Sequence, residues 1–564
     1  MKSPLSALTR LERLRLQFGE SPAREKIAAL TRLSRSRLKT AAQVKRLHEI
    51  LCFMRAYPDS REVLDAAAAM LASFDRRGDL RRRRAALRDT GIAGTAISYP
   101  FFWFTAVWLA RRWPERLTVN WTDFEKKDEL PDLLGLMLPY AQMPVVDEFD
   151  YSPREWVELL KAPKESDAAF LIRRFANLRA DSFLKEKLFE QFDIPVKITP
   201  GPKTPSRTRA GSLPKRPALQ SEPLFRGRPD LTREARRAPL SVRPAPAREA
   251  RALIDLAREA MVTRQRDLDI FENANPADVR VMEFTDGLAL AWFGVLPERR
   301  LLLETLYGFL ILKNGVPIGY GGSSALFGSS EIFFNAFKSF RGAQSGTLFA
   351  RVLAGARALL GSDTFTLDPY QLGRGNAEAI DSGAWWFYQK LGFRPKDAEL
   401  LRLMRRELKK MKSGPRYRSS EGTLRRLAEG NLYLHLGRVR GDVLGELSPG
   451  EISMGALRLL ARRFSSDRGR SDGACAKEAA RLLKAGSLRG WNAAERQAWT
   501  RWAPLILALP GIERWDAARR RALVAVIKAK GGSRESNFAH LMDAHRPLRA
   551  ALLRLRGEAA TASE

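Results

Sequence analysis

One β-hairpin signal constrains the fold of this chain more than any other feature. Residues 309–321 read FLILKNGVPIGYG, two apolar runs joined by Asn314-Gly315. An Asn-Gly pair tolerates the positive φ angles that both central positions of a type I′ turn require. The two runs are therefore predicted to be antiparallel strands, and a purely helical fold is excluded.

Further strands and helices are expected to alternate around this hairpin. Apolar and β-branched runs predict strands, and apolar residues at helical spacing predict helices. This alternation is typical of a mixed α/β domain, which we assign to residues 240–408. The expected strands are 240–245, 331–337 and 364–370, and the expected helices are 252–261, 347–361 and 384–393.

The rest of the chain divides into three parts. Residues 1–198 read mainly as helices, with one short strand at 117–121. Residues 199–239 hold eight prolines and ten basic residues against three acidic ones, which predicts an extended Pro/Arg-rich linker. Residues 409–564 return to helices. The predicted fold class is α+β multidomain, with a central mixed α/β domain flanked by two mainly α-helical domains.

The charge is concentrated outside the α/β domain. The 564 residues include 97 Lys and Arg against 64 Asp and Glu, a formal net charge of +33. Residues 240–408 hold 21 basic and 19 acidic residues, so nearly all of the excess lies in the linker and the helical flanks. Such flanks would attract polyanions, and a nucleic acid or an acidic protein is a possible partner.

Cysteine and apolar patterning indicate the compartment. Cys52 and Cys475 are too far apart in sequence for a disulfide scaffold or a Cys-based zinc cluster, which suits a cytoplasmic protein. Residues 91–110 carry no charge and have the length of a bilayer span. Glycines and a proline interrupt this run and arginines flank it, so we expect a buried helix and no membrane span.

No metal site is expected. The chain has four histidines, and only His540 and His545, with Asp543 between them, are close in sequence. On a helix of 3.6 residues per turn, a spacing of five residues turns the two rings roughly 140° apart. No third strong ligand is near, so a zinc site is not predicted.

The segment with the clearest chemical signal follows the strand at 331–337. The loop 341–346, RGAQSG, opens a helix. Unpaired backbone N–H groups at a helix N-terminus, with the positive end of the helix dipole, suit a pyrophosphate. Arg341 could add a bidentate contact to it.

Taken with its neighbours, this segment resembles the GNAT superfamily of acyl-CoA N-acyltransferases over residues 240–408. Arg341 and Gly346 match the first and last positions of the family's R-x-x-G-x-G/A loop. The run 384–393, AWWFYQKLGF, matches its closing helix. Two positions depart from the family pattern: Gln344 replaces the middle glycine, and Asp381 stands where an asparagine is usual, with Asn376 five residues earlier.

The resemblance implies acetyl-CoA as a cosubstrate, no metal, and an amine acceptor that the sequence does not identify. The strand end would pair with the pantetheine arm, and the loop amides would hold the pyrophosphate. The implied cofactor-binding residues are Asn335, Ala336, Phe337, Arg341, Gly342, Ala343, Gln344, Ser345, Gly346, Thr347 and Asp381.

The resemblance also implies catalytic roles. Tyr388 occupies the position that often protonates the leaving thiolate. Glu331 is the first candidate for the base, since strand alternation puts it on one face with Phe333 and Asn335, and Asp368 is the second. The alternative is a non-catalytic GNAT-like scaffold whose basic helical flanks bind nucleic acid or an acidic protein.

Overall fold

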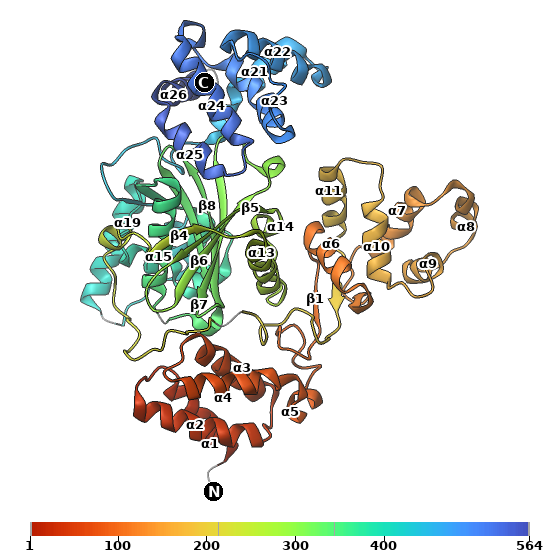
Figure 1. The fold of residues 1–564 in the computed structure, drawn as a ribbon, viewed down its shortest axis with the longest axis vertical. Helices are drawn as coiled ribbons and strands as arrows, with labels where there is room; N and C mark the ends of the chain where they lie inside the picture. The colour runs from red at the N-terminus through yellow and green to blue at the C-terminus, as the bar shows by residue number, and fades with distance from the viewer. Residues whose placement is uncertain (1–2, 212–213, 343, 415, 562–564) are drawn as a thin grey trace. The chain divides into compact units, whose positions relative to one another are not determined.

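The computed structural model describes residues 3–211, 214–342, 344–414 and 416–561. They form two compact units. Unit 1 comprises Met1–Leu224, Arg251–Asn273 and Leu312–Ile318, and unit 2 comprises Phe225–Ala250, Ala274–Ile311 and Gly319–Glu564. The chain is a mixed α+β protein with a multi-stranded sheet and flanking helices (Figure 1), as the sequence predicts at this coarse level.

Unit 1 begins with four amphipathic helices. Polar side chains cap three of their N-termini: Ser3, Thr40 and Ser60 each accept a hydrogen bond from an amide in the first turn. Leucines at helical spacing, such as Leu8 and Leu33, are fully buried between them. The helices are α1 (Pro4–Leu14), α2 (Glu20–Arg35), α3 (Ala41–Ala56) and α4 (Arg61–Ala72).

A small antiparallel sheet forms the second layer of unit 1. Its strands, in the order β1-β3-β2, are β1 (Ile97–Tyr99), β2 (Leu117–Val119) and β3 (Val196–Ile198). β2 confirms the strand expected near 117–121. The apolar run at 91–110 contributes β1 and part of α6 (Trp103–Arg112), which has ten residues. None of the described helices is long and apolar enough to cross a bilayer.

The structure differs from the expected linker over residues 201–210. Thr204, Ser206 and Thr208 are buried although the segment has few apolar residues. Hydrogen bonds replace apolar contacts: the Thr208 hydroxyl lies 2.9 Å from Nε2 of His48, and Arg55 donates to the carbonyls of Thr208 and Ala210. A composition with little apolar surface can still pack when a buried guanidinium satisfies its backbone.

Unit 2 is built on an eight-stranded sheet with the order β11-β10-β9-β8-β7-β6-β5-β4. The predicted turn is confirmed, since Asn314 and Gly315 have φ angles of 49° and 71°. The strands β5, β6 and β11 were not predicted from the sequence. The strands are β4 (Ser241–Pro244), β5 (Ala274–Glu283), β6 (Leu288–Val295), β7 (Thr305–Lys313), β8 (Val316–Leu326), β9 (Ser329–Ala336), β10 (Thr364–Leu367) and β11 (Leu432–His435).

Helix α15 (Ser345–Leu360) covers one face of β9. The burial pattern of β9 alternates, with Ile332, Phe334 and Ala336 on the buried face. Phe334 packs against Phe349 of α15, with ring centroids 5.4 Å apart. The helix ends at Gly361 in a left-handed conformation, as its sequence predicts. α17 (Ala377–Ser382) and α18 (Ala384–Lys390) follow β10.

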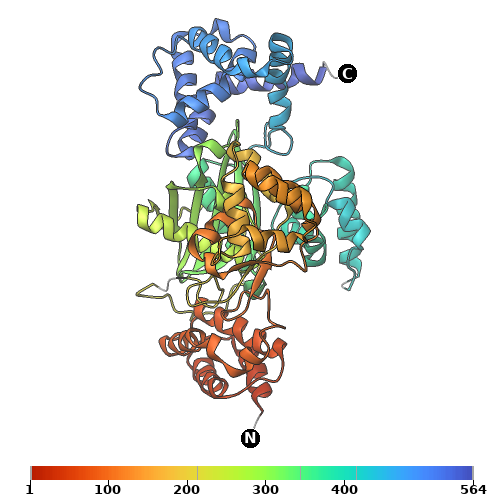
Figure 2. The same ribbon diagram turned by 90° about the vertical axis from the view of Figure 1, so that its right-hand side faces the viewer.

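The C-terminal helices of unit 2 gather at one end of the sheet (Figures 1 and 2). They share a core that includes Trp499 and Trp502. They are α21 (Pro449–Phe464), α22 (Ser471–Leu483), α23 (Ala493–Ala508), α24 (Ala517–Lys530), α25 (Glu535–Ala544) and α26 (Arg546–Thr561).

A buried ionic cluster joins α24 and α25 to the sheet; we call it the clamp cluster (Asp278, Arg300, Tyr307, Lys530 and Glu535). Lys530 Nζ lies 2.6 Å from Glu535 Oε1 and donates to the Glu304 carbonyl. The Tyr307 hydroxyl donates to Asp278 at 2.7 Å, and Arg300 donates to the Lys530 carbonyl. The cluster fixes the position of α25 within unit 2.

Candidate functional site

The site lies where the strands β9 and β10 separate. They are the only parallel pair among the described strand registers. β9 and β10 pair from Ser329 with Thr364 to Glu331 with Thr366. β9 continues to Ala336, whereas β10 ends at Leu367, because Pro369 starts the short helix α16 (Pro369–Leu372). Among the described residues, the part of β9 beyond Glu331 has no partner from β10.

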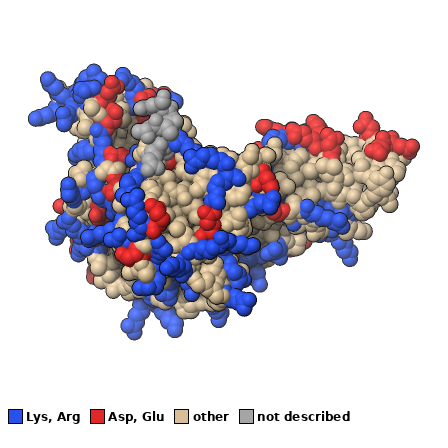
Figure 3. Space-filling model, turned by 90° about the horizontal axis from the view of Figure 1, so that it is seen from above, with Lys and Arg blue, Asp and Glu red and all other residues tan. Residues whose placement is uncertain are grey.

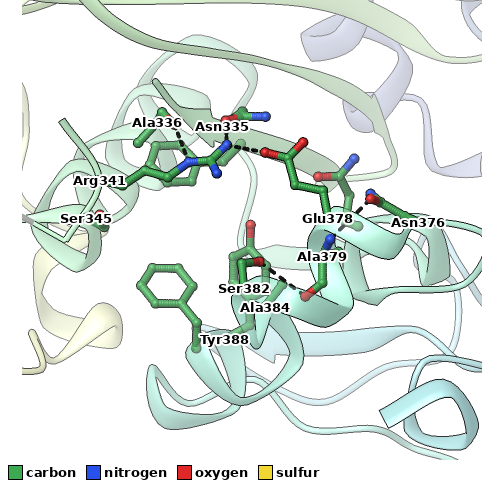
Figure 4. A pocket seen from close by; sticks show the side chains of 13 residues that line it. Asn335, Ala336, Arg341, Ser345, Asn376, Glu378, Ala379, Ser382, Ala384 and Tyr388 are labelled. Carbon is green, nitrogen blue, oxygen red and sulfur yellow. Dashed lines mark hydrogen bonds and ion pairs between the residues drawn. The ribbon is translucent and has the colours of Figure 1, made fainter. Parts of the chain in front are cut away.

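A cavity of about 220 Å³ lies beside this opening (Figure 4). Its walls come from the end of β9, the loop before α15 with the first residue of that helix, and the helices α16, α17 and α18. The lining residues are Phe334, Asn335, Ala336, Arg341, Ser345, Gln371, Asn376, Glu378, Ala379, Ser382, Ala384, Phe387 and Tyr388.

Arg341 reaches across one side of the cavity (Figure 4). Its Nε donates to the Ala336 carbonyl at 2.9 Å, and its Nη2 donates to Asn335 Oδ1 at 3.1 Å. The same Nη2 lies 2.6 Å from Glu378 Oε1. Because the side chains of Arg341 and Glu378 are 37% and 51% exposed, their ion pair contributes little stability, and an anionic ligand could replace Glu378 at small cost.

The loop after Arg341 contains two left-handed positions. Gly342 has φ 81° and open space around its missing side chain. Gln344 has φ 61° and ψ 15°, so it adopts the conformation that favours the glycine found there in the family pattern, at a cost of roughly 1 kcal/mol. Gln344 does not line the cavity. Ala343 lies outside the described residues.

The first turn of α15 faces the cavity through Ser345. Within the described part of the chain, the amides of Ser345, Gly346 and Thr347 have no hydrogen-bond acceptor, as expected for the start of a helix. A Cβ at Gly346 would lie 3.0 Å from Pro229 Cδ and 3.3 Å from Leu391 Cδ2. Glycine at this position therefore serves packing within unit 2.

Tyr388 lies at the foot of the cavity, across from Arg341 and Glu378 (Figure 4). Its side chain is 3% exposed and packs edge-on against Phe349, with centroids 5.2 Å apart. Burial raises the pKa of Tyr388, so the hydroxyl keeps its proton at neutral pH.

Two other residues that the family pattern indicates, Asp381 and Phe337, do not line the cavity. Asp381 is exposed and does not line the cavity. Asn376 does line it: the side chain caps α17 by accepting from the Ala379 amide and donates to the Tyr370 carbonyl. Phe337 is buried against Tyr320, outside the cavity.

Glu331 lies on the other face of β9. The strand registers place Ser324, Glu331, Thr366 and Tyr433 in one row across β8, β9, β10 and β11, and side chains in such a row share a face. The side chain of Glu331 has no hydrogen bond or ion pair with any described residue. Burial, and then the negative charges of Asp368 and Glu304, raise its pKa to about 7.

Asp368, the second base candidate, has a structural partner. Its Oδ1 accepts from the Tyr370 amide at 2.7 Å, which caps α16. Neither Glu331 nor Asp368 lines the cavity, so the structure groups five predicted site residues there: Asn335, Ala336, Arg341, Ser345 and Tyr388.

Several lining residues are absent from the predicted site. Gln371, Glu378 and Ser382 have no sequence signal, because only the path of the chain after β10 brings them to the cavity. Asn376 has one, since an asparagine after glycine that precedes an Ala/Glu-rich run is typical of a helix N-cap.

In comparisons with known proteins, no family model, curated protein or solved structure matches the chain. In the part of the chain that the structure describes, no group of three or more His, Cys, Asp or Glu side chains is arranged to hold a metal ion.

Proposed function

We propose that unit 2 is an N-acyltransferase of the GNAT type that takes an acyl group from coenzyme A. The observation that supports this best is the parallel pair β9–β10, which separates after Glu331 beside a cavity and a helix N-terminus. A strand edge without a partner can pair with an extended amide-containing ligand, which is the chemistry of a pantetheine arm.

The phosphates of such a ligand would lie at the start of α15. The amides of Ser345, Gly346 and Thr347, which have no acceptor among the described residues, and the helix dipole favour an anion there. Arg341 would exchange Glu378 for a phosphate oxygen and keep its bonds to Asn335 and Ala336. The acyl end would enter the cavity toward Phe387 and Tyr388.

Groups on the two sides of β9 would carry out the two proton transfers of the reaction. The nitrogen of a neutral amine attacks the thioester carbonyl, the C–N bond forms, and the C–S bond breaks. The Tyr388 hydroxyl, protonated at neutral pH, donates toward the leaving sulfur. Glu331, with its pKa near 7, accepts the proton that the amine loses, directly or through water.

Calorimetric titration with coenzyme A tests the binding step. We expect the native chain to bind and Ala384→Trp, which fills the cavity from α18, to bind at least tenfold more weakly. Asp381→Trp is the matched control, because it places the same bulk on an exposed position outside the cavity. No binding by the native chain at millimolar ligand would favour the alternative, a non-catalytic scaffold with basic flanks.

Acyl transfer to a panel of amines tests the chemical step. Tyr388→Phe should lower kcat roughly 100-fold or more, with little change in the affinity for coenzyme A. Tyr370→Phe, which alters a half-exposed tyrosine outside the cavity, should leave the rate unchanged. Equal rates for the two variants would remove Tyr388 from the mechanism.

A further inference from the structure

The helix α19 (Ala398–Ser413) carries a row of cations on its outer face. Buried residues Leu400, Leu403, Met404 and Glu407 face the rest of unit 2. Basic residues recur every three or four positions on the opposite side, so they form one ridge along the helix. We call Arg402, Arg405, Arg406, Lys409 and Lys412, all exposed, the α19 ridge.

Basic side chains are common on this protein and cover much of the face seen in Figure 3, so charge alone does not distinguish a surface. On the α19 ridge the positive charge is local and largely uncompensated. Residues 398–426 contain ten basic and three acidic residues. Within the described residues, Arg405, Arg406, Lys409 and Lys412 have no carboxylate oxygen within 4.0 Å, and Arg402 has only Glu399, at 3.9 Å.

Hydrogen bonds to a buried carboxylate hold the helix that carries the ridge in place. The carboxylate of Glu407, 1% exposed, accepts hydrogen bonds from Lys410 Nζ, the Tyr417 hydroxyl and Ser419 Oγ at 2.7–2.8 Å. These bonds hold the segment after α19 against the helix and keep the exposed Arg416 close to its C-terminal end.

Two tryptophans fasten the segment to α18, the helix that carries Tyr388. Trp386 Nε1 donates to Ser419 Oγ at 3.2 Å. Trp385 Nε1 donates to the Leu427 carbonyl at the end of α20 (Glu421–Leu427) at 2.8 Å. The hairpin of α19 and α20 is therefore preorganised on the flank of the sheet (Figure 2), and its cations need little ordering to bind a ligand.

The chemistry of the ridge suits phosphate. Guanidinium groups make paired hydrogen bonds to phosphate oxygens, and three of the five ridge residues are arginines. Residues 402–412 rise over roughly 15 Å, a length along which one duplex strand presents about four phosphates. No large exposed apolar side chain lies on α19 or α20 among the described residues. The buried core of a protein interface is enriched in such side chains, and insertion into a membrane needs them.

We propose that the α19–α20 hairpin binds the phosphate backbone of a nucleic acid, RNA or DNA, without reading its sequence. This surface is independent of the cavity, so it stands whether or not unit 2 transfers acyl groups. It places the nucleic-acid contact at the end of the α/β region, whereas the charge distribution in the sequence had pointed to the helical flanks as a whole.

Fluorescence anisotropy with labelled 20-nucleotide RNA and DNA, single-stranded and duplex, tests the proposal. We compare the native chain with a variant that combines Arg405→Gln, Arg406→Gln, Lys409→Gln and Lys412→Gln. The control combines Arg462→Gln, Arg481→Gln, Arg489→Gln and Arg521→Gln, which removes the same charge from exposed positions on or near the C-terminal helices. Circular dichroism checks that both variants fold.

We expect the hairpin variant to bind at least tenfold more weakly at about 100 mM salt, and the control to lose much less. The slope of log K against log salt for duplexes should fall by up to roughly 3.6 in the hairpin variant, since it removes four cations and each lost phosphate contact removes about 0.9. Stronger binding to RNA or to DNA would identify the source of the phosphates.

Four results would overturn the proposal: no binding by the native chain, equal losses in the two variants, competition by polyglutamate at lower concentration than by nucleic acid, or tighter binding to phosphatidylserine vesicles. If the hairpin variant does not fold, acetylation of Lys409 and Lys412 in the native chain decides the question. Bound RNA or DNA should protect both lysines, and unprotected lysines would contradict the proposal.

Discussion

Charged side chains meet in two places in unit 2, the buried clamp cluster and the half-buried carboxylates around Glu331, and they are compensated differently. In the clamp cluster each charged residue has a partner: Lys530 pairs with Glu535, Asp278 accepts from Tyr307 and from the Glu535 amide, and Arg300 donates to backbone carbonyls. Around Glu331 the neighbouring charges have the same sign, since Asp368 and Glu304 both raise its pKa.

This difference in charge compensation indicates a structural role for the clamp cluster and a candidate functional role for Glu331. In the clamp cluster the attraction between opposite charges and the hydrogen bonds offset part of the cost of burial, and these bonds hold α25 on the sheet. Burial still lowers the pKa of Lys530 and raises that of Asp278. At Glu331 burial and repulsion add, so the folded protein stores unfavourable electrostatic energy that a proton or a cationic substrate would relieve.

The largest effect is expected from breaking the clamp cluster. Glu535→Ala removes the carboxylate partner of the buried Lys530, whose pKa burial already lowers, so the amine must stay charged without a partner or lose its proton. Either outcome should lower the free energy of unfolding, by roughly 3–5 kcal/mol. Urea unfolding followed by tryptophan fluorescence measures this, because Trp499 and Trp502 lie in the core of the C-terminal helices.

Glu513→Ala is the control for that measurement. Glu513 pairs with Arg514 on the surface, where both side chains are well exposed, so its loss should leave the free energy of unfolding close to that of the native chain. Replacing both members of the buried pair, Lys530→Met with Glu535→Leu, should be less harmful than Glu535→Ala. A cost below about 1 kcal/mol for Glu535→Ala would show that the cluster does not stabilise the fold.

A smaller effect of pH is expected from Glu331. Its folded-state pKa of about 7 is above the ordinary value of 4.5, so the folded state binds the proton more tightly than the unfolded state. Stability should therefore fall as pH rises from about 4.5 to about 7, by on the order of 1–3 kcal/mol. Glu331→Gln should remove this dependence of stability on pH. The urea midpoints of the native chain and of the variant, measured from pH 4.5 to 8, should therefore differ by an amount that changes with pH.

An unchanged pH dependence in Glu331→Gln would place the titration elsewhere. Glu378→Gln is the matched variant, because Glu378 is half-exposed and its partner is a cation. That substitution should leave the stability profile between pH 4.5 and 8 as it is in the native chain.

The third and smallest effect is local and lies in unit 1. Asp267 and Glu272 form a hydrogen-bonded carboxyl pair; Asp267 also accepts from the Phe102 amide at the start of α6, and the Thr105 hydroxyl lies within hydrogen-bond distance of both carboxyl groups. Burial raises the pKa of Asp267 to about 7 and that of Glu272 well above its usual range. Because both pKa values are raised, the folded pair holds its protons more tightly than the unfolded chain does, and it loses the first of them as pH rises through about 7. The pair therefore stabilises the fold less as pH rises, and we expect α6 to open more readily.

Hydrogen exchange of the α6 amides, corrected for the intrinsic effect of pH, tests this. Exchange should quicken between pH 5 and 8 in the native chain, and Glu272→Gln, which keeps a hydrogen bond without a charge, should slow it at pH 8. Glu115→Gln, on the exposed surface nearby in sequence, should change nothing. Identical exchange in all three proteins would mean that the pair carries no charge in this range.

Much of the local structure was predictable because its signals are short in range. The Asn314-Gly315 turn, the helix end at Gly361 and the capping box of Asn492 with Glu495 each depend on the φ preference or on hydrogen bonds of a few neighbouring residues. β11 was missed because its four residues form a strand only by pairing with β10, about 70 positions earlier.

The residues of the candidate site also fall into two groups, those that local sequence patterns indicate and those that only the tertiary structure places. Arg341, Ser345 and Tyr388 belong to segments with recognisable patterns, and they line the cavity. Glu378 and Asn376 could not be assigned there, because the loop between β10 and α18 decides which of its residues face β9. The pattern indicated Asp381 for this wall, and α17 turns that side chain to solvent.

By itself the sequence determined the strand–loop–helix order, the turn at Asn314 and the excess of positive charge, since these depend on residue type and near neighbours. Only the tertiary structure decided which charges are compensated. It set Glu535 against Lys530, placed Glu331 among carboxylates, and left four of the five residues of the α19 ridge without a close carboxylate. These differences arise in the tertiary structure because electrostatic free energy depends on distance and burial.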